Sequence, residues 1–503
     1  MFHEKLPMMK RIVLFAVLFC TTPLLIAEEL TKPTFFVGTA RGDITPPKIV
    51  PLWGQFDLRL SQGIETPLTV NVVALESARS SERIDSVIFV STDLLLVNDD
   101  LIEVVRQKVT AKEASIDVNK MVANATHPHT APTTSLTAST LPVADTIMDY
   151  PEVIEFMAER IADAVVAAWK NRKPGKIAFG LDFAVVGWNR RAVYADGRAV
   201  MYGNTNQPDF RGIEAMEDYD IGSLFFLDAE DQLLAIAINV ACPAQVVEGR
   251  NTINADFWHP VRETLARRFG NDVVILGWCG ASGDIAPRPI YRNAAIDRMN
   301  SLRQLDEMQE IARKIDRAVA DTWGAVHTTA SAEVPLVHRV ETLQLPMRRV
   351  TEAEYAQAKT ECERIAAALR ANPGKAPAEV DWMAGGWHGS VVKRYEAQQQ
   401  NPEVRFSTQI HVIRIGETAI FTSPFELFTD FGVQMKARSP ATQTFVIQLA
   451  SGGKEIGLYI PTERAVRGGG YSAIIQSTPV GPEGGQVLVE ATLQQANELF
   501  PKP

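Results

Sequence analysis

The stretch from residue 86 to residue 132 places the strongest constraint on the fold. Residues 86–92 and 122–125 are short apolar runs typical of buried strands, and the amphipathic segment 100–111 lies between them. Two strands joined through a helix pair in parallel, and such a sheet is covered by helices on both faces. A hairpin pattern over residues 224–240 adds antiparallel strands. The sequence therefore predicts an α/β protein with mixed β-sheet layers and flanking helices.

The second of these strands leads into a proline-punctuated loop that contains His127 and His129. Loops at strand ends carry the chemistry of layered α/β folds. His-x-His on an extended backbone sends both rings to the same side, and neutral imidazole is the commonest metal ligand. The pattern also fits loop histidines that make ordinary hydrogen bonds. Asp93, at the mouth of the neighbouring strand, fits either a site residue or a turn and N-cap aspartate.

Composition excludes one class of partner. The chain has 503 residues, of which 46% are hydrophobic and 22% are charged, which is typical of a large folded protein. Its formal net charge is -10. A nucleic-acid partner would require a basic face that neutralises phosphates, so we expect none.

The N-terminus has the layout of a secretory signal peptide over residues 1–27. Lys10 and Arg11 precede the apolar run 12–19, and Ala27 marks the expected cleavage site. We therefore expect a secreted or periplasmic protein with no integral membrane span after signal removal. The cysteines that remain are Cys242, Cys279 and Cys362, an odd number that argues against a disulfide framework.

Three later motifs place polar or small residues where strands end. Asn189 and Arg190 follow a strand, and arginine suits bidentate contact with a carboxylate or polar substrate, although a solvated surface role is the alternative. Small residues concentrated in 280–287 let the backbone approach a ligand closely. Ser423-Pro424-Phe425-Glu426 fits a capping box that opens a helix, which would make Glu426 a structural residue.

Taken in order, these motifs resemble those of the neutral/alkaline non-lysosomal ceramidase family, in its N-terminal catalytic domain. The resemblance implies a single ceramidase-like metal-hydrolase domain over residues 33–503, with no separate C-terminal β-domain. Each motif alone is unspecific, whereas the ordered set is specific. The segments that carry it are Thr39–Pro47, Val90–Asp93, Ala125–Pro132, Gly187–Arg191, Gly280–Pro287, Ser423–Phe428, and Leu458–Thr462 with Gly469–Tyr471.

The resemblance implies a catalytic zinc ion bound by two histidines, a glutamate and a tyrosine, beside a serine that attacks an amide carbonyl. Carried over by position, the first histidine is His127, the glutamate is Glu426 and the tyrosine is Tyr459. His129 and Tyr471 are expected to line the same site. Nitrogen and oxygen donors of this kind suit Zn²⁺ and leave room for water. The ligand role of Glu426 and its capping-box role are rival interpretations.

Two positions depart from the family pattern. Where the family has its second ligand histidine, this chain has Cys242, and a thiolate also binds zinc. His259 or Asp256, a little further along the chain, are the other candidates for the missing donor. Where the family has its nucleophilic serine, this chain has Ala286, which has no hydroxyl group. The family's own substrate, ceramide, is therefore in doubt.

The function these features favour is a secreted, zinc-dependent hydrolase that uses metal-activated water to cleave an amide or ester bond in a small-molecule or lipid-like acyl-amide substrate. A true ceramide N-deacylase, with Ser282 displaced into the nucleophile's role, is one alternative. A non-catalytic binding protein on the same fold is another. The remaining expected roles are proton handling by His129 or Asp284, catalytic-site lining by Tyr471, and substrate contact by Asn189, Arg190 and Ser282.

Overall fold

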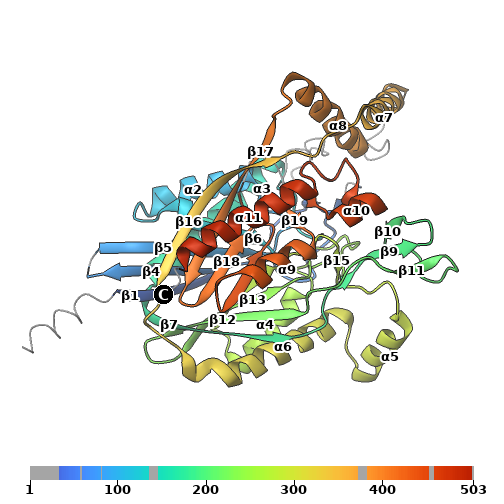
Figure 1. Cartoon of the computed structure of the whole chain (residues 1–503). Helices are drawn as coiled ribbons and strands as arrows, with labels where there is room; N and C mark the ends of the chain where they lie inside the picture. Colours follow the sequence, from blue (N-terminus) through green and yellow to red (C-terminus); the bar gives the residue numbers. More distant parts are fainter. Residues whose placement is uncertain are drawn as a thin grey trace, which may run out of the picture.

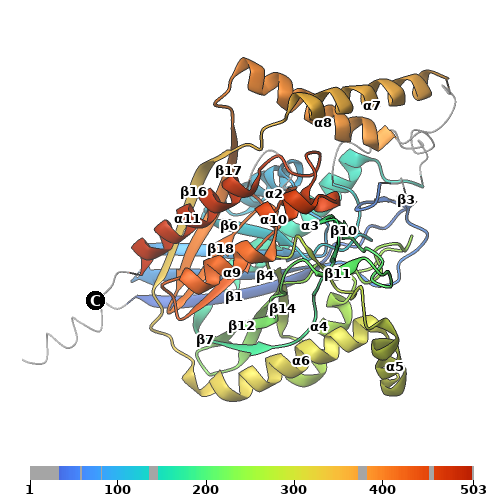
Figure 2. The same cartoon turned by 45° about the vertical axis from the view of Figure 1, so that its right-hand side comes forward.

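The described residues form four layers, with helices on the outside and two β-sheets between them. The computed structural model describes residues 33–56, 59–80, 82–134, 146–371, 382–452 and 458–500. Figures 1 and 2 show the two sheets packed against each other and helices on the outer faces. The expected signal peptide, residues 1–27, lies outside the described residues.

The larger sheet is mixed, as the sequence predicts. β5 and β6 pair in parallel, with Thr92 opposite Ala125, and β13 and β14 pair in parallel, with Val240 opposite Cys279. The predicted hairpin is the antiparallel pair β12 and β13. In spatial order the strands are β14 (Val274–Cys279), β13 (Leu233–Val240), β12 (Asp220–Asp228), β7 (Lys173–Phe183), β1 (Thr34–Asp43), β4 (Thr69–Arg79), β5 (Glu82–Thr92) and β6 (Met121–Ala125).

The smaller sheet packs on one face of the larger one and closes a central core. Apolar side chains of both sheets meet there, among them Phe89, Ile413 and Phe445, which are fully buried. Burying a side chain of that size stabilises the fold by about 1.5–3 kcal/mol. In spatial order the strands are β16 (Leu336–Pro346), β17 (Arg405–Ile415), β18 (Thr418–Thr422) and β20 (Gln443–Ile447).

Amphipathic helices cover the outer faces of both sheets. On the larger sheet, one core includes side chains of α2 (Asp99–Lys112) and α3 (Tyr150–Lys170), and a second includes α4 (Trp258–Phe269) and α6 (Glu307–Val326). On the smaller sheet the covering helices are α9 (Thr429–Arg438) and α11 (Pro482–Leu499). The start of α3 is defined locally, because the Asp149 side chain accepts the Glu152 N–H and a proline follows it.

Several short elements gather at one end of the layers and position the site. Two-residue strands pair there: β8 (Trp188–Asn189) with β15 (Ile285–Ala286), and β19 (Glu426–Leu427) with β21 (Tyr459–Ile460). α7 (Glu352–Ala371) and α8 (Trp382–Gln400) pack together and project from the body (Figure 2). α5 (Asn293–Arg303) ends at Gln304, whose backbone is left-handed, and α6 follows it.

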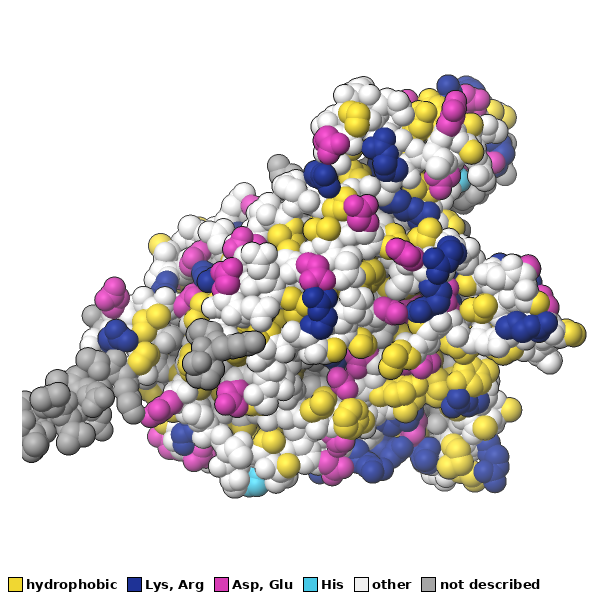
Figure 3. Space-filling view, viewed as in Figure 1, with side chains coloured by type: hydrophobic (Ala, Val, Ile, Leu, Met, Phe, Trp, Pro, Cys, Tyr) yellow, Lys and Arg dark blue, Asp and Glu magenta, His cyan; other side chains and the backbone are white. Residues whose placement is uncertain are grey.

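The surface agrees with the charge balance of the sequence. Figure 3 shows acidic and basic side chains interspersed on the face seen in Figure 1. Within the part of the chain that the structure describes, no helix is both long and apolar enough to cross a bilayer. Cys242 and Cys279 are buried free thiols.

Candidate metal centre

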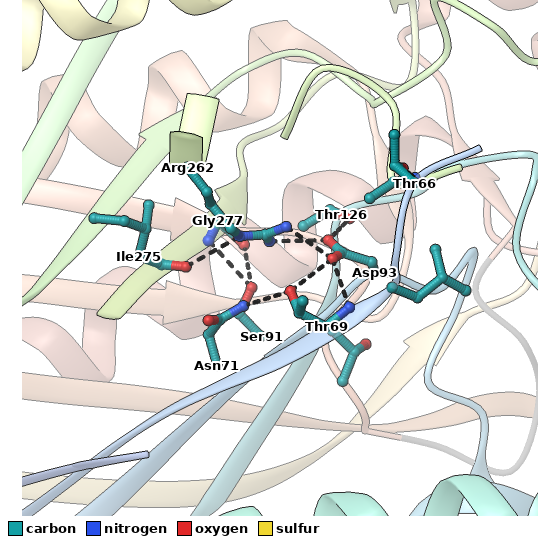
Figure 4. A network of polar contacts seen from close by, with 12 residues as sticks. Thr66, Thr69, Asn71, Ser91, Asp93, Thr126, Arg262, Ile275 and Gly277 are labelled. Carbon is teal, nitrogen blue, oxygen red and sulfur yellow. Dashed lines mark hydrogen bonds and ion pairs between the residues drawn. The ribbon is translucent and has the colours of Figure 1, made fainter. Parts of the chain in front are cut away.

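A buried polar network at the ends of β5 and β6 supports the histidine loop (Figure 4). Because these strands are parallel and in register, Asp93 and Thr126 emerge side by side, and Thr126 Oγ1 donates to Asp93 Oδ1 at 3.1 Å. Arg262, from α4, donates to both carboxylate oxygens of Asp93 at 2.7 and 2.9 Å. The Thr69 N–H and hydroxyl also donate to Asp93. Asp93 is therefore an anchor of the loop and not an N-cap.

This anchored turn presents His127 in one orientation. Its backbone has a φ of +74°, which is strained for a residue other than glycine, and its N–H donates to the Leu94 carbonyl at 3.0 Å. His127 Nδ1 donates to the Leu95 carbonyl at 2.8 Å. Metal-binding histidines typically use the second ring nitrogen in this way. His127 Nε2 is thus left with its lone pair available.

Glu426 and Tyr459 reach the same place because the short strands β19 and β21 pair in parallel, with Glu426 opposite Tyr459. Glu426 Oε2 lies 3.6 Å from His127 Nε2. The capping-box interpretation of Glu426 is wrong, because this residue is in a strand and α9 begins only at Thr429. Long-range pairing of β19 with β21 replaces the local helix start that the sequence favours.

The donors present fit a zinc ion. Two ligands about 2.0–2.2 Å from a tetrahedral zinc ion lie roughly 3.3–3.5 Å apart, close to the 3.6 Å between His127 Nε2 and Glu426 Oε2. Among the described residues, no three His, Cys, Asp or Glu side chains lie together in a way that could hold a metal ion. Tyr459, the third donor that the family resemblance implies, is paired opposite Glu426 across β19 and β21. Burial, reinforced by Glu426, raises the pKa of Tyr459.

His129 lies beside His127 but makes different contacts. The two Nε2 atoms are 3.5 Å apart, and His129 Nε2 is 2.8 Å from the Gln245 side-chain nitrogen. Burial, with the nearby positive charge of Arg190, lowers the pKa of His129 well below its usual value, so the ring is neutral. Gly54, with a φ of +108°, passes so close that a Cβ there would overlap the ring.

The sequence analysis missed three residues that surround His129. Gln245 and Glu248 lie on the loop that follows Cys242, and Glu248 Oε2 is 3.6 Å from His129 Nδ1. Gln55 approaches the same Nδ1 at 3.4 Å. Burial raises the pKa of Glu248. The only sequence signal for these residues is that two of them follow the end of a buried strand, as His127 does.

Arg190 contacts Tyr459 and has one N–H group without a hydrogen-bond partner among the described residues. Its Nη2 donates to the Gly283 carbonyl at 2.9 Å and to the Tyr459 hydroxyl at 3.2 Å. Its side chain is buried, and its Nε has no hydrogen-bond partner within the described residues. A guanidinium with one unmatched N–H beside the donor set suits contact with a substrate oxygen.

Asp284 and Asn189 brace this arrangement from behind. The Asn189 amide donates to Asp284 Oδ2 at 2.8 Å, and both the N–H and hydroxyl of Thr429 donate to Oδ1. Burial raises the pKa of Asp284 to about 6. Because both carboxylate oxygens are already engaged, the geometry favours a positioning contact for Asp284 over the expected proton-handling role. Asn189, similarly, binds Asp284 and the Arg191 N–H instead of facing a substrate.

The Gly280–Pro287 loop presents no free hydroxyl. Ser282 is buried, its Oγ donates to the Gly280 carbonyl at 3.0 Å, and the Gln448 amide donates to it at 2.9 Å. Ala286 is in β15 opposite Trp188 and is fully buried. Ser282 is therefore a hydrogen-bonded turn residue, and the expected substrate contact through its hydroxyl does not fit this geometry.

The three candidates for the missing donor lie elsewhere. Cys242 packs in the apolar core beneath α4 and α6, and burial raises the pKa of its thiol well above the usual value. His259 is on the first turn of α4, partly exposed, 3.5 Å from Glu263. Asp256 is buried and accepts the Val247 and Phe257 N–H groups. These contacts do not support Cys242 or His259 as ligands, and they make Asp256 a loop anchor.

Aromatic side chains form one wall beside the site. Tyr471 packs edge-on against Tyr459, with ring centroids 5.6 Å apart, and stacks on Trp387 of α8 at 5.8 Å and an interplanar angle of 6°. Phe56, which is 49% exposed, lies edge-on to both Trp387 and Tyr471. Burial raises the pKa of Tyr471 to about 12, so its phenol remains protonated at neutral pH.

Comparison with known structures places this fold beside the ceramidases. The crystal structure of neutral ceramidase from Pseudomonas aeruginosa superposes with a TM-score of 0.64 and 15% identity, covering 94% of this chain and 76% of that chain. A ceramidase complexed with C2 gives a TM-score of 0.63 and 14% identity, covering 93% and 75%. No family model matches the chain, and no curated protein matches it. At this identity the likeness shows a ceramidase-like fold.

Proposed function

We propose that this protein is a metal-dependent hydrolase that cleaves an amide or ester bond and holds zinc between His127, Glu426 and Tyr459. The observation that carries the proposal is the approach of His127 Nε2 to Glu426 Oε2, 3.6 Å apart, while Nδ1 is engaged by a backbone carbonyl. The likeness in fold to solved ceramidases supports a hydrolase. Export to the periplasm or the exterior, through residues 1–27, is part of the proposal.

The residues around the donor set have complementary tasks in this proposal. Zinc bound there supplies a Lewis acid and lowers the pKa of water to about 7. Arg190 donates its unmatched Nε–H to the carbonyl oxygen of the substrate and orients it. His129, neutral because of its lowered pKa, accepts a proton at a ring nitrogen and returns it to the leaving group. Attack by water is favoured because position 286 has no hydroxyl and Ser282 is fully hydrogen-bonded.

The first test measures zinc in the full chain. We expect one zinc per wild-type chain and a loss of about 100-fold or more in zinc affinity in His127→Ala. His259→Ala is the matched control: it removes a partly exposed histidine on α4 and should leave zinc content unchanged. Equal zinc occupancy in His127→Ala and the wild type, or no zinc in the wild type under metal-replete conditions, would contradict the proposal.

The second test concerns the nucleophile. Purified protein would be incubated with N-acyl lipids, N-acyl sugars and peptides, and Ser282→Ala would then be measured on whichever substrate turns over. We expect Ser282→Ala to retain most of the turnover, since its hydroxyl is bonded to Gly280 and Gln448. Loss of turnover with zinc and fold intact, or an acyl group trapped on Ser282, would instead support covalent catalysis of the ceramide N-deacylase type.

A non-catalytic binding protein is the second candidate. It is favoured by two observations: position 286 is alanine where the family has its nucleophilic serine, and Cys242, the candidate substitute for the family's second histidine, is buried in an apolar core. Stoichiometric zinc together with turnover of any panel substrate excludes this candidate. Tight binding of a panel compound without turnover would support it.

A further inference from the structure

The loop Ala244–Glu248 lies next to His127 and His129, on a side where no metal ligand has been assigned. The Ala244 N–H donates to the Thr126 carbonyl at 3.2 Å, which ties the loop to the residue before His127. The Val247 N–H donates to the buried Asp256 carboxylate at 2.8 Å. One end of the loop is thus held against the histidine turn and the other end against Asp256. Gln245, between these two anchors, has little freedom to move away.

Gln245 itself is buried and only partly satisfied. Its side chain is 3% exposed, and its amide nitrogen lies 2.8 Å from His129 Nε2, which in turn lies 3.5 Å from His127 Nε2. Its Oε1 is buried and has no hydrogen-bond partner within the described residues. Leaving a buried carbonyl oxygen unmatched costs about 1–3 kcal/mol. The Gln245 Oε1 atom has no hydrogen-bond partner among the described residues and lies close to the proposed zinc ligands. This position indicates that another group binds it.

We propose that Gln245 is an additional metal ligand, with its side-chain Oε1 replacing the histidine that this chain lacks. The inference rests on the proposed zinc site at His127, Glu426 and Tyr459. Cys242 is not available for this task because it is buried among apolar side chains with a raised thiol pKa. The resulting donor set has one imidazole and three oxygens. Oxygen is a harder donor than imidazole nitrogen. This donor set should therefore favour Zn²⁺ over Mn²⁺ less strongly than a set with two imidazoles.

The test compares zinc affinity, measured by chelator competition at one pH, across variants of the full chain. Gln245→Ala should bind zinc about 10–100-fold more weakly than the wild type. Gln245→His should bind zinc more tightly than the wild type, because imidazole is the better zinc donor. The matched control is Gln55→Ala, which removes the other glutamine amide that contacts His129, at Nδ1, and should leave zinc affinity within about threefold.

A second readout separates a ligand from a residue that merely holds His129. Co²⁺ would replace zinc, and its visible absorption bands should shift in Gln245→His, because an oxygen donor becomes a nitrogen donor. This measurement decides the question even if Gln245→Ala fails to fold. Unchanged Co²⁺ bands in Gln245→His, or wild-type zinc affinity in folded Gln245→Ala, would overturn the inference. Loss of zinc in His127→Ala alongside either result would show that the zinc site stands and only the role of Gln245 is wrong.

Discussion

Among the described residues, two histidine pairs have almost the same ring spacing but very different surroundings. The rings of His127 and His129 have centroids 5.1 Å apart, and those of His338 and His411 have centroids 5.0 Å apart. The first pair lies on a loop at the end of a parallel strand. The second pair lies on β16 and β17, inside the stack of sheets.

His338 and His411, the inner pair, form ring hydrogen bonds almost entirely with each other and with the backbone. His338 Nε2 is 2.8 Å from His411 Nδ1, and His338 Nδ1 is 3.1 Å from the Ser86 carbonyl. Burial lowers the pKa of His338 to about 3 and that of His411 well below its usual value. Both rings are therefore neutral, and their role is structural.

The rings of His127 and His129, the outer pair, have acidic neighbours. Glu426 lies 3.6 Å from His127 and Glu248 lies 3.6 Å from His129. A cation can bind between a carboxylate and one nitrogen of an imidazole ring when the other ring nitrogen is already hydrogen-bonded. The two pairs therefore differ in the carboxylates beside their rings and not in the spacing between the rings.

The largest effect is expected from removing Asp93, which anchors the loop that carries His127 and His129. Asp93→Ala removes the fully buried carboxylate that pairs with the half-buried Arg262 guanidinium and frees the Thr126 turn. We expect a loss of about 3–5 kcal/mol in unfolding free energy, measured by urea titration. Asp163→Ala, which removes an exposed ion-pair partner of Lys112, is the matched control and should cost at most about 0.5 kcal/mol. A loss below about 1 kcal/mol in Asp93→Ala would mean that the network does not hold the turn.

A smaller effect is expected from removing the inner pair in a His338→Leu, His411→Leu variant. The pKa of His338 is about 3 in the folded state and 6.5 when unperturbed, so the unfolded chain binds the proton first as pH falls. Stability is therefore full above pH 6.5 and decreases between pH 6.5 and about 3. For one such group the slope is about 1.4 kcal/mol per pH unit.

The variant should accordingly show a shallower dependence of unfolding free energy on pH between about 4 and 7, with unchanged zinc content. His259→Leu, which removes a partly exposed histidine, serves as the control and should keep the wild-type slope. If the double variant also loses zinc, the division between a structural pair and a site pair is wrong.

The smallest effect separates the two members of the outer pair. Gly54→Ala introduces a Cβ against the His129 ring at a position with positive φ. Gly197→Ala is the control, because Gly197 also has positive φ but nothing lies near its Cβ position. Both variants carry the backbone strain, about 1–2 kcal/mol, and Gly54→Ala should cost about 1 kcal/mol more through the clash.

Zinc content should remain at the wild-type level in Gly54→Ala, because His129 is proposed to handle protons and not to bind metal. Its imidazole NMR signals should shift while those of His127 remain. Loss of zinc in Gly54→Ala, with Gly197→Ala unaffected, would make His129 a ligand as well.

The sequence alone determined the layered part of the fold and one half of the site. Apolar runs separated by an amphipathic helix predicted that β5 and β6 pair in parallel, which is confirmed. That pairing brings Asp93 and the His127 loop to one sheet edge, where the sequence already pointed. These features are local, since strand and helix periodicity is written in consecutive residues.

Only the tertiary structure decided what surrounds His127. Glu426 carries a local signal for a helix start, yet the pairing of β19 with β21 places it in a strand opposite Tyr459. Cys242 occupies the chain position where the family has a ligand, yet its side chain packs in the apolar core. Gln245 carries only the signal of following a buried strand, and it reaches His129 through a loop anchored by Asp256. Such contacts depend on long-range register and on which face each side chain takes, and neither is encoded in local periodicity.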